Sequence, residues 1–336
     1  MTAPAHTGAP QFPSSGAALQ PDVSIIMVNW KSAGFVRKCI ESIQRNTRSL
    51  SLEIIVIDSA SHDDCGEMLA RDFPGVIFIQ SPENVGFAKA NNVAARRAGG
   101  RALLLLNPDT ELREDSLRIL VDRLQSTPGA GGVGCRLVSG DGSLQTSCVQ
   151  AFPTVLNQVL DSEFLRRNFP GWSIWGTAPL RSAQPAQAEA VSGACILVKR
   201  EAFDRVGGFS EDYFMYGEDL DLCFKIRQAG YRVYHIPETT IVHFGGGSTR
   251  HSAGTFSNVM MRESVYRFLR HNRGKASAAS YRAAMAAASV VRMLLILPLL
   301  AASGRRGNRP RLGSFQKWLA IFRWSLGLQP LTRVES

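Results

Sequence analysis

Carboxylates stand at points along the chain where they can do chemistry, and Asp109 is the first. It directly follows the apolar run Leu103–Leu106, within Asn107-Pro108-Asp109. A buried strand that ends there delivers a carboxylate to the edge of a sheet, where Mg²⁺ or Mn²⁺ can bind through one or two carboxylates and the phosphates of a substrate. The alternative interpretation is that Asp109 caps the following helix, since Asn, Asp and Thr all favour cap positions.

A second group of carboxylates, Glu218, Asp219 and Asp221, opens a predicted helix after the aromatic segment 213–217. Acidic residues in the first turn of a helix stabilise its dipole, which explains one or two of them without any function. Three carboxylates beside an aromatic cluster and a glycine favour a functional interpretation. A carboxylate held among apolar neighbours has a raised pKa and can act as a base toward a hydroxyl group.

His243 follows an apolar segment and precedes the glycine run 245–247 and Ser248-Thr249. A single histidine after a strand is commonly structural. The functional alternative is an anion site, because three glycines let backbone amides approach an anion closely. His62 and His235 have no such setting and are interpreted as structural.

The elements that must position these side chains alternate between apolar strands and helices. Strands are expected at Val23–Val28, Glu53–Ile57, Val76–Ile79 and Ala102–Leu106, and helices at Phe35–Thr47, Ser61–Arg71, Gly86–Ala98 and Leu112–Leu124. This α/β alternation predicts a mostly parallel sheet covered on both faces. Ligands of such sheets bind beyond the carboxyl ends of the strands, which is where Asn29, Asp58 and Asn107 stand.

The pattern changes after Gly132. Segments Val133–Val138 and Ser143–Val149 flank a Ser-Gly-Asp-Gly turn and predict a hairpin. Residues 152–188 show no clear period and are expected to be irregular. Beyond them we expect a strand at Val191–Val198, helices at Glu201–Val206 and Glu218–Gln228, and extended segments at Tyr231–His235 and Thr240–Phe244.

The positive charge of the chain is concentrated at its C-terminal end. The 336 residues carry 38 Lys and Arg against 28 Asp and Glu. Of these, 14 basic and 2 acidic residues lie in Arg262–Ser336, a charge of +12, so 24 basic and 26 acidic residues, or −2, remain for Met1–Met261. A near-neutral body argues against nucleic-acid binding. The 6 cysteines form no C-x-x-C pair, so a zinc cage or disulfide framework is not expected.

The C-terminal segment has an apolar run, Ala283–Ala302, followed by basic residues interleaved with aromatic ones. The run contains Arg292, and its strongly apolar part, Met293–Leu300, is shorter than the roughly 20 residues that span a bilayer. We therefore expect helices that lie in a membrane interface and attract anionic lipid. One alternative is a transmembrane helix, since the whole run has the roughly 20 residues that span a bilayer. Another is that these helices pack on the rest of the chain or form a homodimer.

Five motifs stand in one order along the chain: Val23–Trp30, Ile55–Asp63, Asn84–Asn92, Asn107–Glu111 and Gly217–Leu222. Together they resemble family-2 inverting glycosyltransferases of the GT-A fold, and within that family the rhamnosyltransferase branch that acts on lipid-linked cell-envelope glycans. The resemblance covers about Val23 to Thr249. It implies a GT-A catalytic domain at 22–255, with a nucleotide-sugar half (22–130) and an acceptor half (131–255). A disordered leader (1–21) and a helical membrane-associating tail (256–336) flank that domain.

The resemblance also implies roles for the carboxylates and the histidine. Asp219 is the implied general base, with Glu218 and Asp221 as supporting acids. Asp109 and His243 are the implied ligands of Mg²⁺ or Mn²⁺, which neutralises the diphosphate of the donor.

The donor nucleotide is expected at Asn29, Asp58, Gly86, Asn91 and Asn107. Two positions depart from the pattern of the family. Ser59 stands where Asn is more frequent, which weakens the inference about nucleoside contacts. Asn107 replaces the first acid of a D-x-D motif, which leaves a metal fewer carboxylates.

The activity implied by the resemblance is transfer of a sugar with inversion, in a single displacement. L-Rhamnose from dTDP-rhamnose is the first expectation for the donor, although galactofuranose or a hexosamine, including UDP-linked donors, would use the same scaffold. The acceptor is expected to be polyprenyl-diphosphate-linked or a polysaccharide, at the cytoplasmic face of a bacterial inner membrane. One alternative is a non-catalytic scaffold that binds a nucleotide sugar. Another is a nucleotidyltransferase, but such enzymes usually have a phosphate-binding loop after the first strand, and Asn29–Ser32 does not form one.

Overall fold

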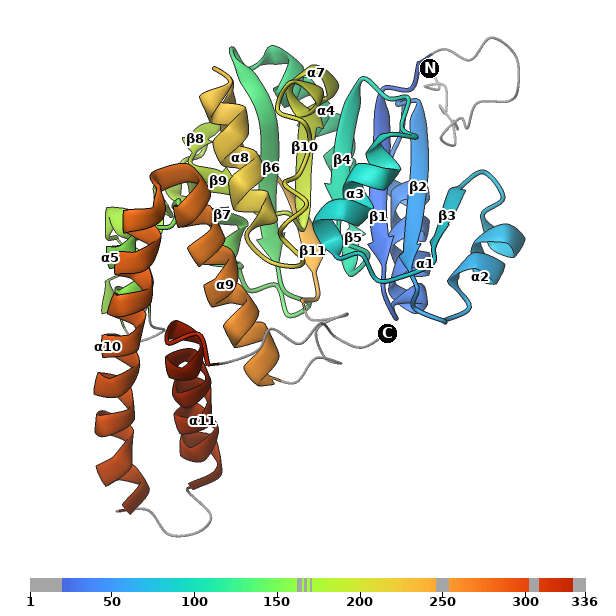
Figure 1. Ribbon diagram of the computed structural model, residues 1–336. Coiled ribbons are helices and arrows are strands. Elements are labelled where there is room, and N and C mark those ends of the chain that lie inside the picture. Colours follow the sequence, from blue (N-terminus) through green and yellow to red (C-terminus); the bar gives the residue numbers. More distant parts are fainter. Residues whose placement is uncertain are drawn as a thin grey trace, which may run out of the picture.

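The computed structural model describes residues 20–161, 165, 168–169, 171–245, 254–301 and 308–328. Within them a nine-stranded sheet runs through the centre in the order β3-β2-β1-β4-β10-β6-β11-β5, and β8 pairs with β11 (Figure 1). Its strands are β1 (Val23–Asn29), β2 (Leu52–Ser59), β3 (Ile77–Ser81), β4 (Ala102–Leu106), β5 (Thr110–Leu112), β6 (Ala130–Val138), β8 (Ala186–Ala188), β10 (Cys195–Lys199) and β11 (Arg232–His243). Two more strands, β7 (Val149–Gln150) and β9 (Ala190–Val191), pair with each other. Nearly all of the predicted leader lies outside the described residues.

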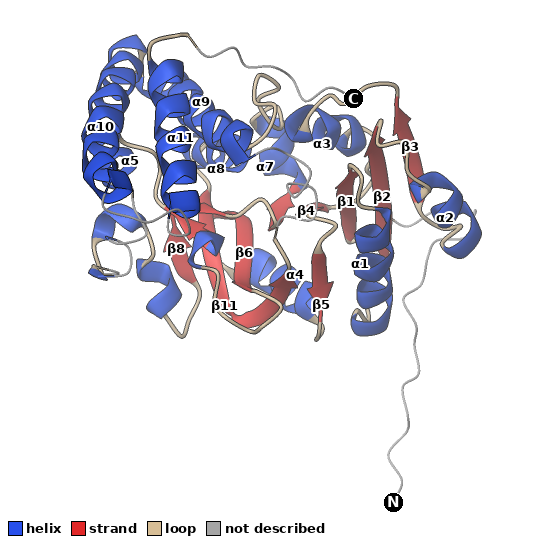
Figure 2. Ribbon diagram, turned by 90° about the horizontal axis from the view of Figure 1, so that it is seen from below, coloured by secondary structure: helices blue, strands red, loops and turns tan. Residues whose placement is uncertain are grey.

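Helices cover both faces of the sheet, as the alternation predicts. Figure 2 shows α1 and α4 on one face and α3 and α8 on the other. The helices are α1 (Ala33–Asn46), α2 (Cys65–Asp72), α3 (Phe87–Ala95), α4 (Ser116–Ser126), α5 (Val155–Leu160), α7 (Arg200–Arg205), α8 (Glu218–Gln228), α9 (Gly254–Arg273), α10 (Lys275–Ala301) and α11 (Asn308–Ser325).

The N-terminal half of the sheet is parallel, and its apolar runs form the core. β1 pairs in parallel with β2 on one side and β4 on the other, and the register places Asn29 opposite Asp58. The side chains of β1 and β4 are almost completely buried on both faces, which is why their sequences are continuously apolar rather than alternating. Side chains that follow these strands therefore gather at one edge of the sheet.

Two predictions for the middle of the chain are wrong. The helix expected at Leu112–Leu124 begins only at Ser116, because Leu112 belongs to β5 and pairs with Ile241 of β11. The expected hairpin is reduced to a turn, in which Val138 and Leu144 form an isolated antiparallel bridge. The chain then leaves through a 3₁₀ turn into β7, whose partner is β9.

Two further segments differ from the expected elements. The strand expected at Val191–Val198 is interrupted at residues 192–194, so that β9 and β10 have different partners. The two extended segments expected before His243 form one long strand, β11, with a shift in register between Ile236 and Thr240. Pro237 lies at that shift, as expected for a residue with no N–H to donate to the ladder.

The C-terminal helices form a unit at one edge of the sheet. α10 and α11 run antiparallel and extend beyond the sheet, while α9 lies alongside α8 (Figure 1). The buried indole of Trp324 in α11 donates to Oε2 of Glu263 in α9 over 3.0 Å, which ties these two helices together. α10 is long and apolar enough to cross a membrane, and its surface includes Val291, Leu294 and Leu295, which are 55%, 61% and 64% exposed.

Candidate active site

A cavity of about 520 Å³ lies where the carboxyl ends of the strands meet the start of α8 and the side of α9. Six of the ten predicted site residues lie on its wall: Gly86, Asn107, Asp109, Glu218, Asp219 and His243. The other four, Asn29, Asp58, Asn91 and Asp221, are not among the residues that line it. The two groups of carboxylates singled out in the sequence therefore face one space.

Asp109 and His243 are brought together by the pairing of β5 with β11. His243 lies opposite Thr110 in this antiparallel pair, and the amide of Phe244 donates to the carbonyl of Asp109 over 2.9 Å. Nε2 of His243 consequently lies 3.4 Å from Oδ1 of Asp109. The glycine run that follows His243 lies, except for Gly245, outside the described residues.

The tautomer of His243 follows from its second partner, Gln145. Nε2 of Gln145 donates to the carbonyl of His243 over 2.7 Å, so Oε1 of the same amide is the acceptor that lies 2.8 Å from Nδ1 of the ring. Nδ1 therefore carries a proton, and in the neutral ring the lone pair of Nε2 faces the carboxylate of Asp109. A proton or a metal ion can lie between two acceptors that face each other in this way.

The carboxylate of Asp109 and the imidazole of His243 suit a divalent metal ion whose other ligands come mainly from the substrate. A carboxylate oxygen and an imidazole nitrogen are both ligands of Mn²⁺, and Mg²⁺ is commonly bound by one or two carboxylates plus phosphates. The hydrogen bond from Gln145 fixes the ring in the way that outer partners orient metal-binding histidines. The described residues contain no cluster of three or more His, Cys, Asp or Glu side chains that could hold a metal, so a metal bound here would have Asp109 and His243 as its protein ligands.

Asp219 is placed by an unusual turn at the start of α8. Tyr216 and Gly217 have φ angles of 70° and 78°, in the left-handed region that a tyrosine adopts at a cost. α9 holds this turn, because Oγ of Ser264 donates to the carbonyl of Met215 over 3.1 Å. A Cβ at Gly217 would lie 3.2 Å from that of Ser264, so the close approach favours glycine.

The carboxylate of Asp219 is held by backbone amides at the wall of the cavity. Its Oδ2 accepts from the amide of Gly193 over 2.9 Å, and its Oδ1 accepts from the amide of Leu220 over 2.8 Å. Burial raises the pKa of Asp219, and the two amides oppose that rise. The result is a fixed carboxylate with a basicity above that of an exposed aspartate, which suits a general base.

Glu218 and Asp221 have different surroundings from Asp219. Burial, and then the charge of Asp219, raise the pKa of Glu218 to about 8, and its buried Oε2 has no hydrogen-bond partner among the described residues. Asp221 instead accepts from Oγ of Ser210 over 2.6 Å and from Nδ2 of Asn272 over 3.1 Å. Asp221 thus connects α8 to α9 behind the cavity.

Asn29 and Asp58 form a buried polar network where β1 and β2 end. Nδ2 of Asn29 donates to Oδ1 of Asp58 over 2.6 Å, and Oδ2 of Asp58 accepts from Nε2 of Gln80 over 2.8 Å. Ser61 also donates to Asp58 through its amide and its hydroxyl. This network supports the floor of the cavity, while the neighbouring Ser59 reaches the wall.

Gly86, Asn91 and Asn107 lie at the junction of the two halves. Gly86 has a φ of 81°, and a Cβ there would lie 2.5 Å from the carbonyl oxygen of Phe214, so this approach requires glycine. Nδ2 of Asn91 donates to the carbonyl of Phe87, and its buried Oδ1 has no partner among the described residues. The amide of Asn107 donates to the carbonyl of Ala194 over 3.0 Å.

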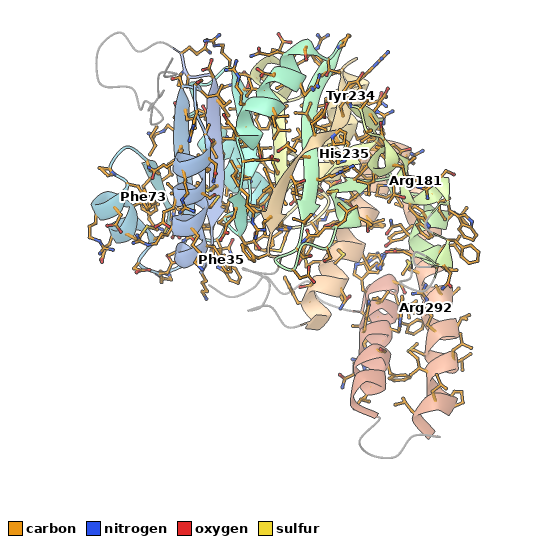
Figure 3. The ribbon with its side chains drawn as sticks, turned by 180° about the vertical axis from the view of Figure 1, so that it is seen from behind. Phe35, Phe73, Arg181, Tyr234, His235 and Arg292 are labelled. Carbon is orange, nitrogen blue, oxygen red and sulfur yellow. The ribbon has the colours of Figure 1, made fainter. Side chains whose placement is uncertain are left out.

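His235, interpreted as structural from the sequence, lies in the interior on β11 (Figure 3). It is completely buried, and burial lowers its pKa to about 4. The ring is therefore neutral at pH 7 and is not part of the cavity.

Sequence reasoning assigned no role to five residues that contribute to the site: Trp30, Ser59, Gln145, Gly193 and Arg262. The indole Nε1 of Trp30 and the hydroxyl of Ser59 are buried without a hydrogen-bond partner among the described residues, and both side chains line the cavity. For Gln145, Gly193 and Arg262 no local pattern signals a role, because each acts through a contact with a distant segment.

Comparison with known families agrees with this architecture. The family described as "Glycosyl transferase family 2" matches residues 24–207, more than half of the chain. A second family, described as "N-terminal domain of galactosyltransferase", matches residues 182–245.

Relatives of known function include two rhamnosyltransferases. The chain is 28% identical over 229 residues to the N-acetylglucosaminyl-diphospho-decaprenol L-rhamnosyltransferase of Mycobacterium tuberculosis, covering 62% of this chain and 73% of the relative. It is 28% identical over 264 residues to the rhamnosyltransferase WbbL of Escherichia coli K12, covering 75% of this chain and 94% of the relative.

Solved structures share the fold at low identity. A mannosyltransferase from Pyrobaculum calidifontis, in complex with GDP-Man and Mn²⁺, superposes with a TM-score of 0.55 at 19% identity, covering 92% of this chain and 87% of that one. The structure of GalNAc-T7 with UDP, GalNAc and Mn²⁺ gives a TM-score of 0.54 at 15% identity, covering 75% and 48%. The fold and the matched segment together show that the chain belongs to glycosyltransferase family 2, has the GT-A fold and is similar to the rhamnosyltransferases of that family.

Proposed function

We propose that the chain transfers a sugar, L-rhamnose from dTDP-rhamnose in the first instance, to a lipid-linked acceptor of the cell envelope, with inversion at the anomeric carbon. The observation that carries this proposal is the single cavity that Asp219 shares with the Asp109–His243 pair. The wall of the cavity presents a fixed base, Asp219, and a carboxylate and an imidazole that could bind a cation. Transfer from a nucleotide sugar needs both.

The donor nucleotide is assigned to the N-terminal half of the cavity. Trp30 and Ser59 line this half of the cavity, and the hydrogen bond between Asn29 and Asp58 fixes the neighbouring strand ends. A divalent metal held by Asp109 and His243 would neutralise charge on the diphosphate leaving group. Asn107, beside Asp109, lines the same part of the cavity.

Asp219 acts on the acceptor. Its carboxylate takes the proton of the acceptor hydroxyl, whose oxygen forms the new bond to the anomeric carbon as the bond to the diphosphate oxygen breaks. Because the base and the leaving group lie at opposite sides of the sugar in this assignment, one displacement inverts the configuration. The backbone amides of Gly193 and Leu220 hold the carboxylate in position during the transfer.

The C-terminal helices are proposed to keep the enzyme on the membrane that carries its acceptor. α10 exposes Leu294 and Leu295, and an apolar helix face beside basic residues binds an anionic interface. We place the protein peripherally at the cytoplasmic face of the inner membrane, with residues 22–255 as the catalytic domain and 256–336 as the membrane-associating tail. The name of the decaprenol-dependent relative supports a lipid-diphosphate acceptor.

A donor screen tests the proposal. The purified full-length chain is incubated with dTDP-rhamnose, UDP-galactofuranose and UDP-N-acetylglucosamine, with and without a short-chain polyprenyl diphosphate-linked N-acetylglucosamine. We expect acceptor-dependent release of dTDP from dTDP-rhamnose, and a product of inverted anomeric configuration by NMR. Turnover of another donor alone would reassign the sugar. Release of inorganic diphosphate, or no turnover at all, would contradict the proposed function.

A further inference from the structure

Three cationic side chains of the C-terminal helices lie together beside the cavity, and we call them the basic cluster: Arg262 of α9, Arg292 of α10 and Lys317 of α11. The guanidinium of Arg292 stacks on the indole of Trp318, 4.2 Å from the ring centroid, and Nζ of Lys317 lies 5.7 Å from the same centroid. Figure 3 shows Arg292 where α10 faces α11. Arg262 is close enough to lower the pKa of both other members by its charge.

Arg262 connects the basic cluster to the cavity. It lines the cavity and is only 9% exposed. One of its terminal nitrogens donates to Oε1 of Gln158 over 3.1 Å, while its buried Nε has no hydrogen-bond partner among the described residues. The hydroxyl of Tyr281 also lies beside this guanidinium. A guanidinium has five N–H donors, so Arg262 keeps donors for an anion in the cavity that it lines.

Among the described residues, the basic cluster carries more positive charge than its neighbours offset. Arg292 donates to the backbone carbonyls of Val159 and Asp161 over 3.0 Å and 3.4 Å, and no side chain in the described part of the chain forms an ion pair with any of the three cations. Burial lowers the pKa of Arg292 and of Lys317, and the repulsion from Arg262 adds to it. The carboxylate of Asp161 opposes these shifts for both residues.

The surroundings indicate which anion completes the site. Toward the cavity, Arg262 faces the space that holds Asp219. Away from it, the same stretch of α10 that carries Arg292 exposes Val291, Leu294 and Leu295. An anion on the basic cluster therefore has a reaction cavity on one side and an apolar surface on the other. A lipid-linked diphosphate has this order of parts, with the sugar at one end and the hydrocarbon chain at the other.

We propose that Arg262, Arg292 and Lys317 bind the diphosphate of the lipid-linked acceptor, with its sugar in the cavity and its lipid along α10. This inference rests on the proposed function, and it makes the C-terminal helices a part of the acceptor site rather than only an anchor. The donor diphosphate is assigned to the Asp109–His243 pair in the other half, so the two diphosphates have separate sites. Arg262, which reaches into the cavity, distinguishes this site from a surface that only attracts lipid head groups.

The first test is binding without turnover. Calorimetry measures the binding of geranyl diphosphate and of geranyl monophosphate as each is titrated into the full-length chain in detergent. We expect the wild type to prefer the diphosphate, and Arg262→Gln and Lys317→Gln each to weaken its binding by about tenfold or more. Arg270→Gln on α9 and Arg323→Gln on α11 remove the same charge from exposed positions and serve as matched controls that leave the affinity unchanged.

The second test separates this inference from the proposed function. In the variants of the basic cluster, KM for the short-chain acceptor should rise by about tenfold, while donor-nucleotide affinity stays at the wild-type value, which also shows that they are folded. Unchanged affinity of these variants for geranyl diphosphate overturns the inference. If the variants also lose vesicle binding while that affinity is intact, the cluster contacts membrane lipid only. A wild type that binds geranyl diphosphate through the cluster but turns over no nucleotide sugar supports the site and contradicts the proposed activity.

Discussion

Nε2 of His243 lies 3.4 Å from Oδ1 of Asp109, although the two residues come from different halves of the chain. The short strand β5 makes this contact, because it pairs with the end of β11 and brings His243 opposite Thr110. Gln145 then fixes the ring so that Nε2 faces the carboxylate.

Replacement of Asp109 by Asn should remove the metal-dependent activity. The amide keeps the size of the side chain but loses its charge, so transfer should fall by on the order of 10²–10⁴-fold, and excess chelator should abolish transfer by the wild type. Steady-state transfer with Mn²⁺ or Mg²⁺ restored after EDTA measures both effects. Glu111→Gln, at an acid of β5 two residues away that does not line the cavity, is the matched control. Full turnover of the wild type in excess chelator would sink the metal assignment.

Gln145→Ala should weaken metal binding without removing a ligand. Loss of the partner at Nδ1 frees the imidazole of His243 to rotate and to change its tautomer, so we expect the metal affinity to fall by about 10–100-fold. Raising the Mn²⁺ concentration should restore turnover, which distinguishes this variant from Asp109→Asn. Gln187→Ala, at an exposed position of β8, should behave as the wild type. A Gln145→Ala enzyme with an unchanged Mn²⁺ requirement would show that the hydrogen bond plays no part.

Asp219→Asn should abolish base catalysis and leave donor binding intact. We expect kcat to fall by roughly 10²–10⁴-fold with the donor affinity unchanged. Because burial raises the pKa of Asp219, wild-type turnover should decline on the acid side at a higher pH than an exposed aspartate would give, and the variant should lack this decline. Asp221→Asn, which perturbs the contact between α8 and α9, serves as a control for stability. Normal turnover by Asp219→Asn would move the role of base to a neighbour.

Glu218→Gln should become more stable than the wild type as the pH rises. Burial and the charge of Asp219 raise the pKa of Glu218 to about 8, above the value of about 4.3 for an unfolded chain. Between these values the unfolded state releases a proton that the folded state retains, so ionisation lowers the free energy of unfolding as the pH increases. The variant lacks this loss, and its advantage should grow to on the order of several kcal/mol by pH 8 and vanish below about pH 4.

Urea unfolding at pH 5 and pH 8.5 measures this difference, with Glu201→Gln at an exposed position of α7 as the control. The expected result is a gain that increases between the two pH values for Glu218→Gln and none for Glu201→Gln. A difference from the wild type that is the same at both pH values would mean that Glu218 is not protonated in the folded protein. At neutral pH, where Glu218 is mostly neutral, the glutamine variant should keep its catalytic activity.

The parallel half of the fold could be predicted from the sequence because its signals are local. The continuous apolar runs of β1 and β4 and the helical spacing of α1 are set by what each element buries. Asn29 and Asp58 could be expected to meet, since strands of a parallel sheet end at one edge. The predictions failed where a distant partner decides the local structure. Leu112 was expected to begin a helix, but it lies in a strand because it pairs with Ile241.

The same reason explains which parts of the site the sequence did not reveal. The break between β9 and β10 is invisible in an apolar segment, yet it brings the amide of Gly193 to Asp219. Gln145 lies after a predicted turn, and its partner His243 lies on another strand. The charge asymmetry of the chain did indicate a basic C-terminal unit, but only the packing of α9, α10 and α11 shows that Arg262 turns toward the cavity.

Substitution of the exposed leucines of α10 should detach the protein from membranes. Leu294 and Leu295 are 61% and 64% exposed, and burial of a leucine contributes about 1.5–3 kcal/mol, so Leu294→Gln with Leu295→Gln should weaken binding to vesicles at least about tenfold. Flotation with vesicles that contain anionic lipid measures the loss of vesicle binding. Ile77→Gln, at a partly exposed position of the edge strand β3, should float as the wild type does. Flotation of the double variant at the wild-type level would contradict the interfacial role of α10, and wild-type protein that resists alkaline carbonate would show that α10 spans the bilayer instead.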